Sequence, residues 1–333
     1  MKIGVVIPAY NGERYVADCL GSLKAQTHAD WEAYVMDDGS RDGTLAAVRA
    51  FAEADPRIRV WHQENCGLVA TMNALLDRLD DSVELVSFLD VDDFIHPQAF
   101  ETLAAALERT GADVAECSIM PVPADSVPAE VFASPVEGAA ERVMDDMSVY
   151  WLHRTSPAGW INKQNKLYRR SAIGALRFQP TLSYEDDYFF ACEVNAQIRR
   201  KVKVDARLYA YRATPGSATA SIPFRKYVLA TLERIRLSCA VFLDAGRVPK
   251  EFEAEYRAEL AKDAYRMCIR KNLKKNGNAS ERRELFALAG EAFARLELEH
   301  GFRPVGLNPV QWLVYWACRR GNYVLARLVV YLT

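Results

Sequence analysis

Short apolar runs alternate with amphipathic stretches over residues 2–119, and this alternation limits the possible folds more than any other feature of the chain. Strands are predicted where the apolar runs are short, at 2–7, 31–36, 58–61, 85–89 and 114–119. Helices are predicted where apolar residues recur at helical spacing, at 13–26, 44–54, 68–79 and 97–109. Strands joined by helical crossovers indicate an α/β fold with a doubly wound, mostly parallel sheet.

The pattern changes in the second half of the chain. Residues 121–135 are rich in Pro, Ala and Ser, which predicts a loop, and a helix at 187–198 and a strand at 202–211 follow. Helices are then predicted at 223–245, 249–275, 280–299 and 309–332. We therefore expect a sheet-containing domain at 1–220 and a helical region at 221–333.

Charge is distributed unevenly between the two parts of the chain. Residues 1–198 carry a net charge of -15 and residues 199–333 carry +13, although the whole chain carries only -2. The basic part suits an anionic membrane surface, a phosphate-bearing acceptor, or simply a solvated helical surface. Seven scattered cysteines without CxxC spacing argue against a disulfide framework and a structural zinc site. With no signal peptide recognised, we expect a cytoplasmic protein.

Two acidic clusters follow predicted strands. Asp37 and Asp38 begin the run DDGSRDGT, and Asp90, Asp92 and Asp93 lie in DVDD. Strands that end in carboxylates deliver them to the edge of the sheet where open α/β folds bind ligands. Neighbouring carboxylates repel one another, so a cation, protonation or full solvation is needed to accommodate them. A divalent metal that carries a nucleotide diphosphate meets this demand best.

Three motifs together carry a resemblance to a known family. The runs VVIPAYN at 5–11, DDGSRDGT at 37–44 and FLDVDD at 88–93 resemble, in this order and spacing, those of family 2 glycosyltransferases with the GT-A fold. The resemblance is strong over the first hundred residues, continues more loosely to about residue 220 and fades beyond it. It implies a Rossmann-like, mostly parallel sheet flanked by helices, and an inverting transfer of sugar from a UDP-sugar.

The resemblance also assigns residues to the nucleotide. Asp38 matches the aspartate that accepts a hydrogen bond from uracil, a suitable role because uracil offers one imide N–H. The Tyr10 ring and the backbone beside it are placed to meet the flat base. Met72 departs from the family, which commonly has an arginine there, so another group must supply that charge. The expected nucleotide-binding residues are Pro8, Ala9, Tyr10, Asn11, Glu13, Asp38, Gly67, Asn73, Asp90, Val91 and Asp92.

The DVDD run is a DxD pattern. Alternation along an extended chain would point Asp90 and Asp92 the same way, toward the ribose and the metal. The resemblance makes Asp92 the metal ligand, with Asp90 close to the ribose or the metal. Mn²⁺ or Mg²⁺ would take one or two protein carboxylates and the phosphate oxygens of the donor, and would neutralise charge on the departing diphosphate.

A base must deprotonate the acceptor hydroxyl. The run YEDDYFF at 184–190 resembles the Glu-Asp motif of the family, which makes Asp186 the expected base and Glu185 the alternative. Position at a helix N-terminus is expected to lower the pKa of this carboxyl.

Three more residues are candidates for the acceptor or diphosphate side. Trp160 either stacks on a sugar or belongs to the core, because an aromatic ring suits both places. Lys166 lies in the same segment. Arg212 either pairs with phosphate oxygens or lies at the surface.

The last segment leaves its role open. Residues 310–318 and 323–332 are apolar runs separated by Arg319, Arg320, Gly321 and Asn322, and each run is too short to cross a bilayer. Aromatic residues beside arginines suit a helix lying in a membrane interface, whereas packing on the catalytic domain or on a second subunit is equally open.

These observations predict an inverting, metal-dependent glycosyltransferase that moves a sugar from a UDP-sugar to a saccharide or lipid-linked acceptor in bacterial surface polysaccharide synthesis. The expected partners exclude nucleic acid and include peripheral membrane contact through 309–333 and a homodimer as possibilities. A sugar-nucleotide pyrophosphorylase would open with a Gly-rich phosphate loop, which Pro8–Gly12 is not, and a glycoside hydrolase would need no nucleotide site. A non-catalytic sugar- or nucleotide-binding module is the alternative from a different class.

Overall fold

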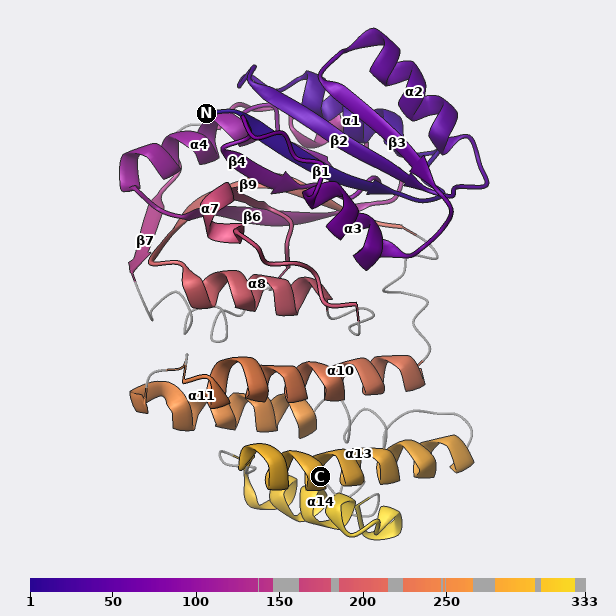
Figure 1. The fold of residues 1–333 in the computed structure, drawn as a ribbon, viewed down its shortest axis with the longest axis vertical. Helices are drawn as coiled ribbons and strands as arrows, with labels where there is room; N and C mark the ends of the chain where they lie inside the picture. Colours follow the sequence, from indigo (N-terminus) through magenta and orange to yellow (C-terminus); the bar gives the residue numbers. More distant parts are fainter. Residues whose placement is uncertain are drawn as a thin grey trace. The chain divides into compact units, whose positions relative to one another are not determined.

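The computed structural model describes residues 1–136, 138–145, 162–180, 186–214, 224–246, 248, 250–265, 279–302 and 307–326. By its internal contacts the chain divides into two compact units (Figure 1). Residues 1–180 and 186–220 form the first unit, and residues 221–333 form most of the second.

A nine-stranded sheet forms the centre of the first unit, with strand order β3-β2-β1-β4-β8-β6-β9-β5 and β7 paired to β9. Its strands are β1 (Ile3–Ala9), β2 (Trp31–Asp38), β3 (Ile58–Gln63), β4 (Leu85–Phe88), β5 (Phe94–Ile95), β6 (Val114–Pro123), β7 (Glu141–Asp145), β8 (Lys166–Arg169) and β9 (Arg200–Ala213). Strands β3, β2, β1 and β4 run parallel, whereas β8 is antiparallel to both β4 and β6. All seven residues of β1 are buried, as the middle strand of a sheet covered on both faces requires.

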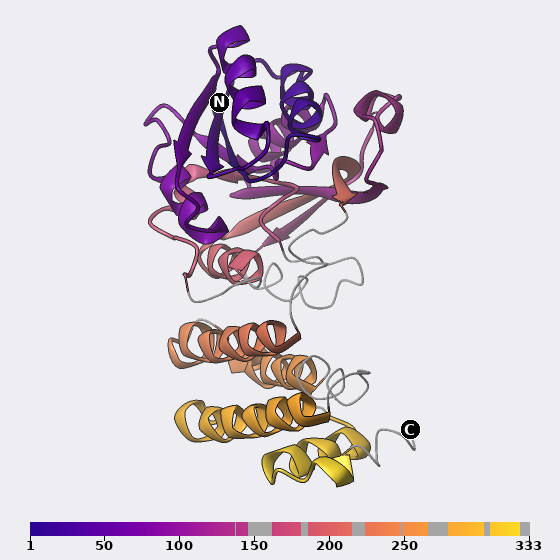
Figure 2. The same ribbon diagram turned by 90° about the vertical axis from the view of Figure 1, so that its right-hand side faces the viewer.

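Helices cover both faces of this sheet (Figures 1 and 2). The helices of the first unit are α1 (Val16–Lys24), α2 (Thr44–Ala54), α3 (Leu68–Leu76), α4 (Ala99–Thr110), α5 (Pro128–Val131), α7 (Arg170–Ile173) and α8 (Asp186–Gln197). Side chains of α1, α2 and α4 share one hydrophobic cluster with Val5 and Ile7. Side chains of α3, α7 and α8 share another with Val6, which points to the opposite face.

Four aromatic rings pack together at the end of β4, whose last residue is Phe88. The Phe88 ring meets those of Tyr168, Phe178 and Phe190 edge-on, with centroids 5.6–5.7 Å apart, and Phe178 stacks on Phe190 at 4.1 Å. We call these four residues the aromatic cluster. Offset and edge-on aromatic pairs contribute about 0.5–1.5 kcal/mol beyond their buried area. The aromatic cluster therefore joins β4 to α8, two elements far apart in the sequence.

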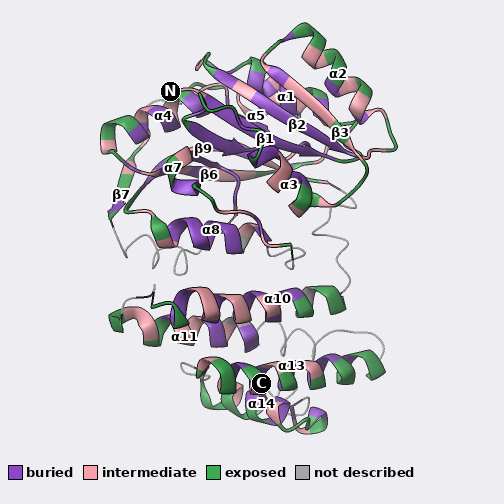
Figure 3. Ribbon diagram, in the orientation of Figure 1, coloured by how far each residue is buried: buried purple, intermediate pink, exposed green. Residues whose placement is uncertain are grey.

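The second unit is helical, as expected. Its elements are α10 (Phe224–Ser238), the π-helical turn η1 (Cys239–Asp244), α11 (Lys250–Asp263), α13 (Ala279–His300) and α14 (Pro309–Arg319). Figure 3 shows buried and exposed faces along these helices. Asn308 begins α14 with a capping box, in which its side chain accepts from the Gln311 N–H and the Gln311 side chain accepts from the Asn308 N–H.

The predicted α/β fold with a helical C-terminal region is confirmed, with three differences. The sheet is mixed, because the strands after β5 enter it in both directions. The loop predicted at 121–135 instead contains the end of β6 and the short helix α5. β1 continues through Pro8 to Ala9, which predictions based on proline as a strand terminator do not foresee.

Candidate functional site

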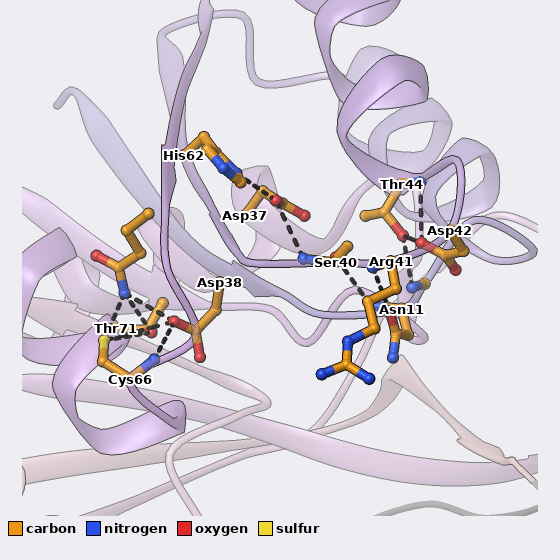
Figure 4. Close-up of polar contacts among 12 residues, drawn as sticks. Asn11, Asp37, Asp38, Ser40, Arg41, Asp42, Thr44, His62, Cys66 and Thr71 are labelled. Atoms are coloured by element: carbon orange, nitrogen blue, oxygen red, sulfur yellow. Dashed lines mark hydrogen bonds and ion pairs between the residues drawn. The ribbon is translucent and has the colours of Figure 1, made fainter.

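The candidate site begins where β1 ends. The Asn11 side chain accepts a hydrogen bond from the Arg41 N–H at 2.9 Å, and the Asn11 N–H donates to Ser40 Oγ at 2.9 Å. Glu13 Oε2 accepts from the Gly43 N–H at 2.8 Å. Figure 4 shows how the Asn11 contacts tie this turn to the loop after β2. Asn11 and Glu13 thus hold the two loops together, while Tyr10 remains 47% exposed and open to a ligand.

Gly43 cannot be replaced without disturbing this junction. A Cβ at Gly43 would lie 2.4 Å from Glu13 Oε1. A Cβ at Gly12 would lie 2.8 Å from Val91 Cγ1, because the turn after β1 also packs against the acidic turn after β4. Since β2, β1 and β4 are parallel neighbours, their carboxyl ends form one edge.

The carboxylates that end β2 accept hydrogen bonds from neighbouring groups. Asp38 Oδ1 accepts from the Cys66 N–H (Figure 4) and from the Gln63 amide, each at 2.9 Å. Asp38 Oδ2 accepts from the Gly67 N–H at 2.9 Å. Burial alone would raise the pKa of Asp38, but these hydrogen bonds lower it below the ordinary value. Asp38 therefore stays ionised at neutral pH.

Asp37 is fully buried and points to the other side. Its Oδ2 lies 2.7 Å from Nδ1 of His62 and also accepts from the Ser40 N–H (Figure 4). Asp37 is 0% exposed, whereas the His62 side chain is 47% exposed. His62 therefore presents a nitrogen-bearing ring beside the Asp37 carboxylate, in a place that sequence reasoning did not identify.

Met72, the position at which the sequence departs from the family, and Asn73, a predicted nucleotide-binding residue, face the protein interior. Met72 is fully buried in the hydrophobic cluster of α3, so it offers nothing to a ligand. The Asn73 side chain donates to the Phe178 carbonyl at 2.9 Å and accepts from the Phe178 N–H at 2.8 Å. Gly67 adopts a φ of +88° at the head of α3, where its N–H reaches Asp38.

The DVDD run forms a turn rather than an extended strand. The Asp93 N–H donates to the Asp90 carbonyl at 3.0 Å, so the expected alternation of Asp90 and Asp92 does not occur. Each carboxylate takes its own partner instead. Asp90 contacts Lys163 Nζ at 3.1 Å, Asp92 accepts from Thr214 Oγ1 at 3.0 Å, and Asp93 accepts from Tyr209 Oη at 2.6 Å.

Burial and mutual repulsion dominate this turn electrostatically. Burial, followed by the Asp90 charge, raises the pKa of Asp92. Burial and the charges of Asp90 and Asp92 raise the pKa of Asp93 well above its ordinary value. Within the described ranges, Asp92 forms no ion pair. A cation beside Asp92 would relieve the repulsion, and carboxylate oxygen is a ligand that Mn²⁺ and Mg²⁺ accept.

Asp186 is the first residue of α8, as the predicted base requires. It is 5% exposed, and its Oδ2 has no hydrogen-bond partner among the described residues. Burial and then the Asp187 charge raise the pKa of Asp186 to about 7. The expectation of a lowered pKa at this helix N-terminus is thus wrong, because desolvation and a like charge outweigh the helix dipole.

Lys163 joins the acidic turn to the head of α8. Its side chain is 1% exposed, and its Nζ lies 3.1 Å from Asp90 Oδ1 and 3.1 Å from Asp187 Oδ1. Burial lowers the pKa of Lys163, but the carboxylates of Asp187, Asp90 and Asp186 outweigh it, and the net shift is upward. Lys163 therefore remains an ammonium.

Two of the remaining candidates make contacts within the protein. Lys166 Nζ donates to oxygens of Asn162, Gln164 and Asn165 at 2.8–3.2 Å and lies 3.6 Å from Glu116.

Arg212 is 3% exposed. Its guanidinium pairs with Asp18 at 2.8 Å and lies within 5.0 Å of the ring centroids of Tyr15 and Phe94. The backbone N–H of Arg212 donates to Asp93. Trp160 and Glu185 lie outside the described residues.

The structure therefore adds Lys163, Gln164, Tyr209, Thr214 and His62 to the residues around the predicted site. Lys163 and Gln164 lie in the segment already noted for Lys166, and Tyr209 lies beside Arg212. No spacing in the sequence distinguishes them, because each reaches an aspartate more than 20 residues away along the chain.

Two further features are absent from the described ranges. No group of three or more His, Cys, Asp or Glu side chains is arranged to hold a metal ion there. Among the helices described, none combines the length and the apolar character that a bilayer crossing requires.

Comparisons with known proteins agree with the sequence motifs. The family model "Glycosyl transferase family 2" matches residues 4–202. "Glycosyltransferase GlyA" of Streptococcus pneumoniae is 29% identical over 78% of this chain, which corresponds to 37% of GlyA. "Putative teichuronic acid biosynthesis glycosyltransferase TuaG" of Bacillus subtilis is 36% identical over 27% of this chain and 36% of TuaG. The chain thus spans well under two thirds of these relatives.

A solved structure shares the fold. The structure of S. aureus TarS 1–349 in complex with UDP-GlcNAc matches 99% of this chain and 91% of the TarS chain with a TM-score of 0.73, at 20% identity. The family model covers more than half of the chain, and the sheet, the motifs and their order agree with it. The chain therefore belongs to glycosyl transferase family 2.

Proposed function

We propose that this protein catalyses an inverting transfer of a sugar from a UDP-sugar to a hydroxyl group of a saccharide or lipid-linked acceptor. The observation that carries the proposal is the pairing, through Lys163, of the Asp90 turn with Asp187 at the head of α8, next to the buried Asp186 carboxyl. One side suits a metal-bound diphosphate, and the other suits a base. Such a pair serves a direct displacement, in which no enzyme nucleophile is needed.

On the donor side, the nucleotide would lie along the carboxyl ends of β1, β2 and β4. Tyr10 is exposed beside this edge, and Asp38 Oδ2 makes only one of its possible hydrogen bonds to a described residue. Asp38 would accept the imide N–H of uracil, and the Tyr10 ring would cover the base.

The metal site in this proposal centres on Asp92. Asp90 is paired with Lys163, and Asp93 is bonded to Tyr209 and to the Arg212 N–H. Asp92 has only the neutral Thr214 hydroxyl as its partner among the described residues, so it fits the role of carboxylate ligand. Mn²⁺ or Mg²⁺ bound there would neutralise the charge that develops on the leaving diphosphate.

Asp186 would take the proton of the acceptor hydroxyl. A buried carboxyl with a pKa of about 7 is half ionised near neutral pH, which is the range in which a general base works best. Glu185 remains the alternative base on sequence grounds. Proton removal then coincides with attack on the sugar carbon and departure of UDP on the opposite side.

The acceptor is proposed from the relatives. TuaG is named for teichuronic acid biosynthesis, and TarS was solved with UDP-GlcNAc. We therefore propose a bacterial surface polysaccharide as the product and a hexose or N-acetylhexosamine as the transferred group.

A donor panel tests this function. The full chain is incubated with UDP-glucose, UDP-galactose, UDP-GlcNAc and UDP-GalNAc, each with Mn²⁺, Mg²⁺ or EDTA, and UDP release is followed with and without saccharide acceptors. We expect acceptor-stimulated release with at least one donor and loss of release in EDTA. A protein that binds these donors without releasing UDP would be a binding module instead.

We propose in addition that α14 contacts the membrane surface. Trp312, Leu313 and Trp316 lie on its exposed side and are 47%, 41% and 37% exposed, and the Arg320 guanidinium lies 4.5 Å from the Trp316 ring. Tryptophan beside arginine is typical of helices that lie in a membrane interface.

Co-sedimentation with vesicles that contain phosphatidylglycerol tests this contact. We expect Trp312→Ser with Trp316→Ser to reduce binding strongly. The control Leu298→Ser removes an 86% exposed apolar side chain from the same unit and should bind like the wild type. A wild-type dimer that the double variant loses, without vesicle binding by either, would assign the surface to a second subunit.

A further inference from the structure

Lys163 lies deep in the protein between two carboxylates from distant parts of the chain. Its Nζ is 3.1 Å from Asp90 Oδ1, and 3.1 and 3.2 Å from the two Asp187 oxygens. Asp90 follows β4, and Asp187 is the second residue of α8. An ammonium that is 1% exposed requires such partners, because burying an unpaired charge is costly.

The turn that carries Lys163 is held firmly. Asn165 has a φ of +53°, a conformation that few residues other than glycine adopt, and its carbonyl accepts from the Cys117 N–H at 2.9 Å. The Lys166 ammonium lies inside the turn and binds four oxygens of residues 162, 164 and 165. Tyr168 Oη donates to the Lys163 carbonyl at 3.1 Å. Lys163 is therefore fixed before any ligand arrives.

The same turn holds Asp90 at a second point. Gln164 Nε2 donates to Asp90 Oδ2, so adjacent residues of one turn bind both oxygens of this carboxylate. Asp187 adjoins Asp186, whose Oδ2 is buried without a partner among the described residues. A shift of Asp187 therefore moves the head of α8 and Asp186 with it.

We infer that Lys163 is a positioning residue that fixes the head of α8, and with it Asp186, relative to the acidic turn at Asp90. The inference rests on the proposed function, in which Asp186 is the base and the acidic turn holds the donor diphosphate. The reacting hydroxyl must lie between these two groups, and a displacement of about 1 Å in such an arrangement reduces the rate about 100-fold. Lys163 sets this separation without touching either substrate.

A second buried lysine provides a matched control. Lys201 is also 1% exposed and forms an ion pair with a partly buried carboxylate, Glu116, but this pair joins β9 to β6 within the sheet. Lys163→Met and Lys201→Met therefore each remove a buried ammonium from an ion pair, although Glu116 keeps Lys166 at 3.6 Å. Only Lys163→Met removes the link between Asp90 and Asp187.

The experiment compares the two variants with the wild type at 15 °C, using the UDP-sugar found in the donor panel and calorimetry with UDP and Mn²⁺. For Lys163→Met we expect kcat to fall about 100-fold, with donor KM and UDP affinity within about threefold of the wild type. For Lys201→Met we expect kcat within about threefold. A kcat for Lys163→Met equal to that of Lys201→Met would overturn the inference.

Two further measurements cover the remaining outcomes. If Lys163→Met does not fold, the double variant Lys163→Met, Asp187→Asn removes one orphaned charge and should show the same loss of kcat. Crystal structures of Lys163→Met and the wild type give a readout that does not depend on activity. In the variant, the head of α8 should move away from Asp90. An unmoved head of α8 refutes the positioning role, whereas a wild type that uses no donor refutes only the proposed function.

Discussion

The two acidic clusters follow β2 and β4, the two strands that flank β1, yet the protein stabilises them by different means. Neutral donors surround Asp38, mostly backbone N–H groups and an amide, and they lower its pKa. The turn at Asp90 is crowded with carboxylates, and burial raises the pKa of Asp92 and Asp93. The charge of Asp38 in the first cluster is thus already stabilised by hydrogen bonds, whereas the second cluster retains excess negative charge that a cation would relieve.

Asp92→Asn tests this contrast with the largest expected effect. Removing the carboxylate that lacks a charged partner should abolish metal-dependent transfer, with kcat reduced more than about 10⁴-fold, because stabilisation of the leaving diphosphate is lost. UDP release in the presence of Mn²⁺ measures the change. Asp55→Asn, which removes a buried carboxylate paired with Arg57 at the end of α2, is the control and should retain the wild-type rate. Normal turnover by Asp92→Asn would place the metal elsewhere.

Asp186→Asn separates donor binding from transfer. We expect kcat to fall about 10²–10⁴-fold, the usual contribution of general base catalysis, while the affinity for UDP with Mn²⁺ stays within about threefold. In the wild type, kcat should fall tenfold per pH unit below about pH 7, because protonation of Asp186 removes the base. A large loss of UDP affinity would instead assign Asp186 to the donor side, and an unchanged kcat would favour Glu185 as the base.

Asp38 and Asp186 should also respond oppositely to pH in their effect on stability, which is the smallest of the three effects. Asp38 has a lowered pKa, so its contribution is present above about pH 4 and is lost as the pH falls further. Asp186 has a raised pKa, so its burial costs stability as the pH rises from about 4 to 7 and its carboxyl ionises.

Melting temperatures measured from pH 3 to 8 check both signs. Relative to the wild type, Asp38→Asn should lose most stability at neutral pH and little at pH 3. Asp186→Asn should gain stability relative to the wild type as the pH rises. If the melting temperatures of the wild type and Asp186→Asn change by the same amount from pH 3 to pH 8, the raised pKa of Asp186 is contradicted.

The order of elements in the first unit could be predicted well because local patterns determine it. α2 begins and ends at the predicted residues, 44 and 54, and β2 and β4 each begin where their apolar runs begin. The short strand β5 was missed, since Phe94 and Ile95 form it only by pairing with Ala210 and Tyr209 far along the chain. The mixed direction of the sheet is likewise a matter of long-range pairing.

The site could be predicted less completely than the order of elements. The motifs identified the acidic residues, but not which of them forms no ion pair with any described residue. That distinction depends on Lys163, Tyr209 and Thr214, which reach the acidic turn from more than 70 residues away. The raised pKa of Asp186 was also out of reach, because the helix dipole lowers the pKa of a carboxyl while burial and the Asp187 charge raise it, and burial is not visible in the sequence.

The aromatic cluster has a consequence for how the protein is made. Phe88 leaves the ribosome about 100 residues before Phe190, an interval of about 5–20 s at ordinary rates of synthesis. During that time β4 lacks the rings of Tyr168, Phe178 and Phe190 that cover it in the finished fold. The nascent chain therefore exposes the apolar surface of β4 until α8 (Asp186–Gln197) has emerged.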